Sequence, residues 1–423
     1  MKVILPIIAF SFICHTIVAQ SPQKAALPAP FATKSTKNFS KVIGWENGVI
    51  PRAPKGFVVT LYADGLQNPR WTYVTPNGDV LVAESNTIKN TVMQVGAVVL
   101  GAAKAENMKK SANRISILRD TTGDGHPDLK QVFLEDLNQP FGMLIMDNQL
   151  YVANTDALLR YPYQPGQLKM DSAGEVLMDL PAEKRNQHWT RNIITNADSS
   201  RIYIAVGSVD NLGDNGKEVN PRRACILEVD KDGHGERIYA SGLRNPVGMA
   251  WAPGTKTLWA AVNERDELGD DLVPDYLTSV KDGGFYGWPY SYFGQHADPR
   301  IEAPRPDLVQ KAIVPDVSLG AHTASLGLAF YTKTAFPKKY RGGAFIAQHG
   351  SWNRSQLAGY KVVFVPFRNG KPSGKPEDFL TGFTAGKDNE VHGRPVGVTI
   401  LPDGSMLVTD DVNDKIWRVA AVK

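Results

Sequence analysis

The feature that most constrains the fold is a short sequence pattern that occurs six times. Each copy has polar residues, an apolar run, a turn, and a second apolar run that ends in small or polar residues. Short apolar runs bounded by Gly, Pro, Asn and Asp are typical of β-strands joined by tight turns. The pattern therefore predicts six copies of one antiparallel hairpin. The copies are "NPRWTYVTPNGDVLVAES" from residue 68, "QPFGMLIMDNQLYVANT" from 139, "RNIITNADSSRIYIAVGS" from 191, "NPVGMAWAPGTKTLWAAVNE" from 245, "LGLAFYTKTAFPKKYRGGAFIAQHG" from 326 and "RPVGVTILPDGSMLVTDD" from 394.

Six such hairpins, each with two further outer strands, predict an all-β fold: a six-bladed β-propeller of four-stranded antiparallel blades. Outer strands are expected in "NRISILRD", "ACILEVD" and "YKVVFVPF". Because the ring has to close, "GFVVTLYA" from residue 56 is expected to pair into the blade that contains "MLVTDD" and "KIWRVAAV". A pair of β-sandwiches is the alternative, but six copies of one hairpin favour the propeller.

The N-terminal part of the sequence predicts the domain organisation and the location of the protein. The apolar segment "MKVILPIIAFSFICHTIVAQ" is typical of a secretory signal peptide over residues 1–19, which predicts a periplasmic or secreted protein. The segment is too short for a good membrane span. Residues 20–55, rich in Pro, Ser, Lys and Ala, are expected to be a flexible leader, and residues 56–423 the propeller.

Charge and cysteine content exclude several classes of protein. The formal net charge of +4 is mild and dispersed, which argues against nucleic acid as a partner. Cys14 lies in the signal segment, so the mature chain keeps only Cys225 and can form no intrachain disulfide. Cys225 opens the apolar run "CILEVD" and is expected to be a buried strand residue rather than a nucleophile.

The repeats are expected to gather polar side chains at one mouth of the ring. Residues just before each first strand and just after each antiparallel second strand should share one rim, and the mouth of a closed β-fold is a common place for a ligand. The preceding set is Arg70, Gln139, His188, Arg244 with Asn245, His322 and Arg394. The following set is Glu84, Asp156, Asp210, residues 263–266, residues 349–354, and Asp410 with Asp411.

These rim residues favour an anionic ligand and proton transfer. Arg244, Arg354 and Arg394 can bind carboxylates through two-point contacts. His188 can accept a proton near neutral pH. Taken singly, a loop histidine is usually a surface or capping residue and a rim arginine is usually in a salt bridge. Six repeats that deliver such residues to one place favour a site. We expect Arg244 to act on the ligand and to contribute little to stability.

The segment "NERDELGDDLVPDY" contains five carboxylates within eight residues, from Glu264 to Asp271. Such density is costly unless the charges are solvated or neutralised, and Ca²⁺ is the cation that oxygen ligands suit best. An exposed acidic loop is the alternative. A second acidic stretch, from Asp120 to Asp128, is interpreted as a hairpin turn rather than a metal loop. The segment from 91 to 110 is the most helix-like insertion, and we expect it to pack on the propeller.

Four stretches carry a family resemblance: "GLRNPVGMAW", "NERDELGDDLVPDY", "GGFYGWP" and "HGSWNR". In this order they resemble the sorbosone dehydrogenase group of pyrroloquinoline quinone (PQQ)-dependent sugar dehydrogenases, which is related to the soluble quinoprotein glucose dehydrogenases. The resemblance extends from about residue 56 to the end. It implies a six-bladed propeller, in agreement with the count of repeats.

The resemblance also implies roles for single residues. His188 resembles the catalytic base, and Arg244 resembles the arginine beside the reactive quinone carbonyl. Contacts to the cofactor PQQ are implied at Gln139, Asn245 and Arg394, and within residues 349–354, where His349 and Arg354 are the cationic side chains. Catalytic Ca²⁺ is implied at Arg265 and Asp266, through main-chain oxygens, and a further Ca²⁺ at Asp270, Asp271 and Tyr286. The segment "RDELGDD" differs from the glycine-rich calcium loop of the glucose enzymes.

The implied function is oxidation of a sugar hemiacetal or aldehyde by hydride transfer to the quinone, with His188 as base. Electrons are expected to leave to an external acceptor, a cytochrome or a quinone, because the chain has no Cys-x-x-Cys-His haem site. Two alternatives stay open. One is a metal-dependent lactonase on a six-bladed propeller, and the other is a non-catalytic propeller that binds carbohydrate or protein.

Overall fold

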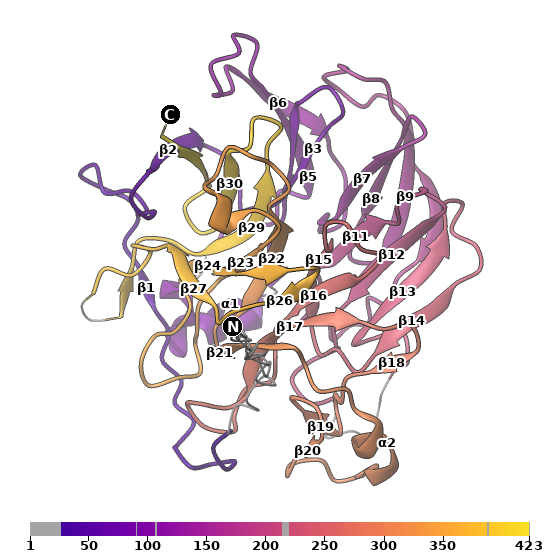
Figure 1. Ribbon diagram of the computed structural model, residues 1–423, viewed down its shortest axis with the longest axis vertical. Coiled ribbons are helices and arrows are strands. Elements are labelled where there is room, and N and C mark those ends of the chain that lie inside the picture. Colours follow the sequence, from indigo (N-terminus) through magenta and orange to yellow (C-terminus); the bar gives the residue numbers. More distant parts are fainter. Residues whose placement is uncertain (1–26, 90, 106–107, 214–219, 387–388, 423) are drawn as a thin grey trace, which may run out of the picture.

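The computed structural model describes residues 27–89, 91–105, 108–213, 220–386 and 389–422, and these residues form a six-bladed β-propeller (Figure 1). Each blade is an antiparallel sheet of four strands, and the third blade gains a short fifth strand in parallel. The predicted fold class is therefore confirmed. The blades, each given from its innermost strand outwards, are numbered here in the order of those strands along the chain.

The first blade contains β3 (Pro69–Val74), β4 (Val80–Glu84), β5 (Arg114–Arg119) and β6 (Leu129–Leu134). The second contains β7 (Met143–Met146), β8 (Gln149–Ala153), β9 (Ala157–Pro162) and β10 (Glu175–Asp179). The third contains β11 (Arg191–Thr195), β12 (Arg201–Val206), β13 (Cys225–Asp230), β14 (Arg237–Ser241) and the added β18 (Gly284–Phe285).

The fourth blade contains β15 (Pro246–Trp251), β16 (Leu258–Val262), β17 (Pro274–Val280) and β21 (Val317–Ala321). The fifth contains β22 (Ser325–Phe330), β23 (Ala344–Gln348), β24 (Lys361–Val365) and β27 (Glu377–Leu380). The sixth contains β29 (Pro395–Ile400), β30 (Met406–Asp410), β31 (Lys415–Ala421) and β2 (Phe57–Ala63).

Short elements occupy the connections. They are β1 (Lys41–Val42), α1 (Thr91–Val99), η1 (Ala102–Lys104), β19 (Ser291–Tyr292), β20 (His296–Ala297), α2 (Pro306–Lys311), η3 (Lys338–Tyr340), β25 (Phe367–Arg368), β26 (Lys371–Pro372) and β28 (Glu390–Val391). No helix among the described residues combines the length and apolar character needed to cross a membrane.

Strand β2 closes the ring. It pairs antiparallel with β31, so that Phe57 lies opposite Ala421 and Leu61 opposite Trp417. The sixth blade thus takes three strands from the end of the chain and one from its beginning, as the sequence predicts. Each innermost strand also contacts the innermost strand of the next blade, from β3 through β29 and back to β3.

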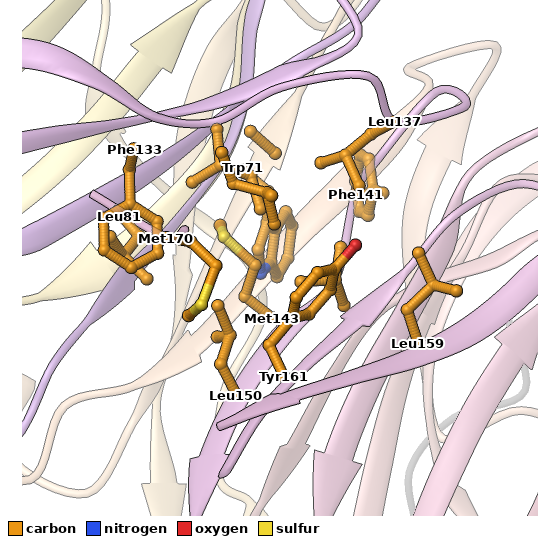
Figure 2. Close-up of a cluster of buried hydrophobic side chains, with 14 of the residues drawn as sticks. Trp71, Leu81, Phe133, Leu137, Phe141, Met143, Leu150, Leu159, Tyr161 and Met170 are labelled. Carbon is orange, nitrogen blue, oxygen red and sulfur yellow. The ribbon is translucent and has the colours of Figure 1, made fainter. Parts of the chain in front are cut away.

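The second strands of four blades are buried along their whole length, because neighbouring sheets cover both of their faces. These are β4, β16, β23 and β30. Their nearly continuous apolar runs follow from this double burial. Figure 2 shows the contact between the first and second blades, where Trp71 from β3 packs on Phe141, with ring centroids 5.0 Å apart.

Glycines in the innermost strands let the blades approach closely. A Cβ added at Gly327 would lie 2.4 Å from the carbonyl oxygen of Val396, and one added at Gly248 would lie 2.5 Å from that of Leu326. Gly142 and Gly397 make similar close approaches to the neighbouring backbone. The repeated glycine of "FGM", "VGM", "LGL" and "VGV" therefore follows from the narrow centre of the ring.

Replacing Gly327 with alanine is expected to lower the free energy of unfolding by about 3 kcal/mol, the upper end of the cost of overpacking. The atoms in the way belong to the backbone of the next blade and cannot rotate aside. Thermal unfolding measures the effect. Gly96→Ala is the matched control, because a Cβ there meets nothing within 4 Å. An unchanged melting temperature in Gly327→Ala would contradict this account of the ring.

The predicted leader differs from expectation where it is described, over residues 27–55. Strand β1 pairs with β28, the backbone N–H of Asp270 donates to Thr33 Oγ1 over 2.7 Å, and Trp45 Nε1 donates to Asp410 Oδ2 over 2.6 Å. This part of the chain therefore lies against the propeller rather than forming a mobile tail. Its polar residues are used in contacts that composition does not reveal. The predicted signal peptide, residues 1–19, lies outside the described residues.

Three smaller predictions concern local structure. Cys225 is buried at the start of β13, as expected. Residues 120–128 form the turn between β5 and β6, and the Asp120 carboxylate accepts hydrogen bonds from the backbone of Gly123 and Gly125. The helix-like insertion forms α1 and η1, and the side chains of Met93, Val95, Val98 and Val99 on α1 are exposed.

Candidate functional site

At the mouth of the ring, residues that precede the first strand of a repeat contact residues that follow the second strand of the same repeat or of a neighbouring one. The backbone N–H of Ser208, after β12, donates to the carbonyl of Arg244, before β15, over 2.7 Å. Similarly, Asn263 N donates to the Asn245 carbonyl over 3.0 Å, and Arg394 N donates to Asp410 Oδ1 over 2.9 Å. One mouth of the ring therefore carries both predicted sets of residues.

A cavity of about 510 Å³ opens at this mouth, beside the third and fourth blades. Its volume lies within the range usual for small-molecule sites, about 300–1,000 Å³. The two residues predicted to be catalytic, His188 and Arg244, both line it. Other lining residues come from the ends of second strands and from more distant loops: Asp210, Asn211, Asp266 and Trp352.

The hydrogen bonds of His188 fix its tautomer. Its Nδ1 lies 3.0 Å from the carbonyl oxygen of Ser208 and 2.9 Å from Ser208 Oγ. A carbonyl only accepts, and the Ser208 hydroxyl donates its own proton to the Asp210 carbonyl over 2.6 Å. Nδ1 therefore carries the proton and donates it to Ser208. In the neutral ring, Nε2 then holds the lone pair that can accept a proton.

The surroundings also keep His188 neutral. Burial, and then the positive charge of Arg244, hold the pKa of His188 well below its usual value. Arg223 and Arg191 act in the same direction, while the hydrogen bond to the Ser208 carbonyl opposes them. At neutral pH the imidazole is therefore unprotonated. A neutral histidine with a fixed Nδ1–H and a basic Nε2 is suited to remove a proton from a ligand.

Arg244 is held in place by four acceptors. Its Nη1 donates to the carbonyl of Glu264 over 2.7 Å and to both oxygens of Asn263, and its Nη2 donates to Asn211 Oδ1 over 3.1 Å. Only 3% of the residue is exposed. Its Nε is buried without a hydrogen-bond partner among the described residues. The guanidinium is thus rigidly placed and keeps a donor for a ligand.

Gly207 and Asn245 lie close to His188. A Cβ added at Gly207 would lie 2.4 Å from Asn245 Oδ1 and 2.6 Å from His188 Cβ. Asn245 Oδ1 is itself buried without a hydrogen-bond partner in the part of the chain that the structure describes. Asn245 therefore lies next to the two predicted catalytic residues, and its side-chain oxygen stays available.

The other predicted cofactor contacts are occupied by the protein itself. Arg394 donates to the carbonyls of His349, Gly350 and Ala105 at 3.0–3.1 Å. Gln139 Nε2 donates to the Asn86 carbonyl over 2.8 Å. Arg354 Nη2 pairs with Asp271 Oδ1 at 2.8 Å. These three residues lie on the same mouth but do not line the cavity that contains His188 and Arg244.

His349 belongs to a separate charged cluster on this mouth. Its Nε2 lies 2.9 Å from Asp411 Oδ1, and Asp411 also pairs with Arg70. Burial, and then the charge of Arg394, lower the pKa of His349 to about 4. Although burial opposes ionisation of Asp411, its interactions with His349 and Arg70 hold the pKa of that carboxyl well below its usual value. His349 is thus a neutral partner of a buried carboxylate.

The five residues predicted to hold two Ca²⁺ ions have different partners within the protein. Asp266 lines the cavity, where its Oδ1 lies 2.8 Å from His322 Nδ1. Asp270 instead accepts from the backbone and hydroxyl of Ser355, and Asp271 pairs with Arg354. Among the described residues, no three or more His, Cys, Asp or Glu side chains gather in a way that could hold a metal ion.

Arg265 and Tyr286 have structural surroundings. Arg265 is buried, and its Nε lies 3.2 Å from Asp298 Oδ2. Tyr286 is buried and donates to the Ser279 carbonyl over 2.6 Å, while the backbone N–H of Lys281 donates to the Tyr286 hydroxyl over 3.0 Å. The Tyr286 hydroxyl is thus already hydrogen-bonded within the protein. Glu264 is buried as well, and this burial raises its pKa to about 7.

Sequence reasoning missed several contributors to the site, among them Asn211, which lines the cavity, and Ser208 and Gly207, which adjoin His188. Ser208 and Gly207 end the run "IAVGS", where small residues are a common way to end a strand. Trp352 was noted only as part of the segment 349–354. It stacks on Phe39, with ring centroids 5.8 Å apart, so the N-terminal segment supports one wall of the cavity. The only signal for Ser208 is that it follows a second strand, as Asp210 does.

Comparison with known proteins identifies the family. A family model described as "Domain of unknown function (DUF7133)" matches residues 52–417, which is most of the chain. The chain belongs to the DUF7133 family. An uncharacterized protein of Borreliella burgdorferi is 30% identical to this DUF7133 chain over 294 residues, which cover 67% of the chain and 76% of that protein.

Two further similarities of the DUF7133 chain involve proteins with named activities. Quinoprotein glucose dehydrogenase B of Acinetobacter calcoaceticus is 24% identical over 301 residues, which cover 62% of this chain and 55% of that protein. The holo form of the pyranose dehydrogenase PQQ domain from Coprinopsis cinerea superposes with a TM-score of 0.69 at 19% identity, over 90% of this chain and 100% of that domain. The structural similarity shows a shared fold.

The names of these similar proteins bear on the family resemblance read from the DUF7133 sequence. These names agree with the broader class that the sequence resembles, the PQQ-dependent sugar dehydrogenases. The narrower sorbosone dehydrogenase group stays a prediction.

Proposed function

We propose that the protein is a PQQ-dependent oxidoreductase that oxidises a sugar at a hemiacetal or aldehyde carbon. The observation that carries the proposal is the pair formed by His188 and Arg244 in one cavity. His188 is neutral, with its Nδ1–H bound by Ser208, and Arg244 is a buried guanidinium beside it. A base next to a fixed positive charge suits removal of a proton as negative charge develops on a bound acceptor.

The residues present fit PQQ. The cavity is large enough for a small-molecule cofactor, and Arg244 Nε and Asn245 Oδ1 are buried without partners among the described residues. A guanidinium donor suits the carboxylates and carbonyl oxygens of PQQ. The other predicted contacts, Gln139, His349, Arg354 and Arg394, are engaged with the protein, so we assign binding to the part of the mouth around Arg244 and Asn245.

The chemistry divides between the cofactor and the chain. When bound, PQQ supplies a quinone that accepts a hydride. His188 Nε2 would accept the proton from the hydroxyl on the anomeric carbon of the sugar. A cyclic hemiacetal thus loses one hydride and one proton and becomes a lactone, and a hydrated aldehyde loses the same two and becomes a carboxylic acid. Arg244 would orient the cofactor and stabilise the charge that develops on it. The protonated His188 would then release its proton to solvent through the open mouth.

No step of the proposed reaction is assigned to Ca²⁺. The prediction rests on the dense carboxylates of residues 264–271, but Asp266, Asp270 and Asp271 each have partners within the chain, and Tyr286 is satisfied by the backbone. The side chains of the two predicted Ca²⁺ sites are thus engaged within the protein, and the two sites stay predictions. Main-chain oxygens of Arg265 and Asp266 stay the predicted ligands, and elemental analysis of the purified protein tests that prediction.

Two parts of the proposal concern the surroundings of the enzyme. The segment of residues 1–19 predicts that the reaction takes place in the periplasm or outside the cell. Electrons are expected to leave to an external cytochrome or quinone. The lactonase alternative would need converging metal ligands, and among the described residues no three or more His, Cys, Asp or Glu side chains gather in that way.

Reconstitution tests the proposal. The full chain, incubated with PQQ, is expected to reduce a redox dye when an aldose or sorbosone is added, and to show no dye reduction without PQQ. The assay is run with and without added Ca²⁺, and PQQ binding is measured separately by calorimetry. Failure to bind PQQ would contradict the proposal. Lactone hydrolysis that depends on a metal and not on PQQ would favour the lactonase instead.

A further inference from the structure

The insertion between β4 and β5, residues 85–113, is attached to the mouth at several points. Trp189 Nε1 donates to Thr87 Oγ1 over 3.0 Å, and Gln139 Nε2 donates to the Asn86 carbonyl over 2.8 Å. Arg394 Nη1 donates to the Ala105 carbonyl over 3.0 Å. Polar residues from three blades thus hold both ends of the insertion, while its middle carries α1, labelled in Figure 1.

The middle of the insertion exposes apolar side chains. The structure has 15 large apolar residues exposed among those it describes, and six of them fall between residues 88 and 100. Val98 is 65% exposed and Val99 is 78% exposed. The six residues, called the α1 patch below, are Ile88, Met93, Val95, Val98, Val99 and Leu100. Contiguous exposed apolar surface of this kind marks an interaction site.

Val95, Val98 and Val99 form one apolar side of α1, and Met93 lies outside it. At about 100° per residue, Val98, Val95 and Val99 lie roughly 140°, 200° and 240° around the helix axis from Met93. A groove on a partner protein covers one stripe of a helix, with apolar residues three and four positions apart. One apolar side also suits a bilayer surface, into which an amphipathic helix buries its apolar side, so the surrounding charges decide between the two partners.

The charges around the α1 patch are positive. The insertion contains Lys89, Lys104, Lys109 and Lys110, and its described residues include no acid. Its single acid in the sequence, Glu106, lies outside the described residues. Lys104 and Lys110 are exposed, and Lys109 pairs with Asp414 at 2.7 Å. Lysines at the edge of an apolar projection are attracted to anionic lipid headgroups.

We propose that the α1 patch docks the protein on the surface of an anionic lipid bilayer. Val98, Val99 and Leu100 would enter the boundary between headgroups and acyl chains, and the flanking lysines would contact the headgroups. This is attachment to one face of the membrane, without crossing it. Because the insertion is held at the mouth, docking would place the cavity of His188 and Arg244 close to the lipid surface.

Vesicle binding tests the proposal with the full chain, without PQQ, so its outcome is independent of the proposed function. The protein is expected to sediment with vesicles of phosphatidylglycerol and phosphatidylcholine, and weakly with phosphatidylcholine alone. The double variant Val98→Asp/Val99→Asp is expected to lose binding. Lys104→Glu/Lys110→Glu should weaken binding by about fivefold or more for each lysine replaced. Val176→Asp, at an exposed apolar residue of β10, is the matched control and should bind as the wild type does.

Two results would overturn the proposal. One is the absence of sedimentation with anionic vesicles. The other is equal binding by the wild type and by a folded Val98→Asp/Val99→Asp variant, with folding checked by thermal unfolding. If the protein does not bind vesicles but forms a dimer that this double variant dissociates, the α1 patch belongs to an interface with a second copy of the chain.

Discussion

Replacing His188 with alanine is expected to lower sugar turnover by about 10²–10⁴-fold while PQQ binding is retained, because a positioned general base contributes a factor of that size. The neutral imidazole, with Nδ1–H held by Ser208, is the only feature of His188 that the proposed reaction uses. Steady-state turnover with saturating PQQ measures the loss, and calorimetry measures PQQ affinity in the same variant.

The pH dependence separates a base from a structural residue. Burial and Arg244 hold the pKa of His188 well below its usual value, so wild-type turnover should persist below pH 6.5 and fall only as the pH drops through that lowered pKa. This fall should be absent from the residual activity of His188→Ala. Ser208→Ala should lose less turnover than His188→Ala, because the backbone carbonyl of residue 208 stays as an acceptor for His188 Nδ1. Near wild-type turnover in His188→Ala would remove His188 from the role of base.

Replacing Arg244 with alanine is expected to reduce turnover by about 10²–10³-fold, the usual cost of removing a donor aimed at developing negative charge. Lysine should restore little of this loss, because its point charge cannot keep the contacts with Asn263, Glu264 and Asn211 that a planar guanidinium makes. Turnover and PQQ affinity are measured in both variants.

The structure corrects the expectation that Arg244 contributes little to stability. The residue is buried, and its removal leaves the carbonyl of Glu264 and the oxygens of Asn263 without this donor. Each buried unsatisfied group costs about 1–3 kcal/mol. We therefore expect a lower melting temperature as well, and activity has to be compared well below it. Arg119→Ala is the matched control, because Arg119 pairs with Asp79 outside the cavity and should affect stability alone. Full activity in Arg244→Ala would contradict the proposed site.

The sequence predicts the ring and its mouth well because repetition carries that information. Six hairpins place His188 and Arg244 at one rim, whatever the lengths of the connections between them. The partners of long side chains are not encoded in this way. The guanidinium of Arg394 reaches three carbonyls, and that of Arg354 reaches Asp271, so neither lines the cavity. A rim position predicts where a residue lies, and not what it binds.

Dense charge and small residues mislead for related reasons. Five carboxylates between Glu264 and Asp271 indicate a metal, but in the structure three of them contact Ser355, Arg354 and His322, a fourth pairs with Arg300, and Glu264 accepts from the backbone. Ser208 and Gly207 resemble an ordinary end of a strand, although they hold His188 and leave room for it. The composition of residues 27–55 is that of a tail, but Phe39 and Trp45 have partners far along the chain.

The pairing of β2 with β31 makes the order of synthesis matter. The register runs from Phe57 against Ala421 to Ala63 against Ile416. The first blade strand to be synthesised therefore cannot pair until the last one has been made. Until then one face of the first blade and one face of the fifth lack the complete sixth blade beside them, and β2 has no partner along its edge. Such apolar faces and strand edges favour aggregation. Removal of a few residues from the end of β31 would therefore release both ends of the ring at once. Any tag placed after residue 423 has to leave this final strand free to pair.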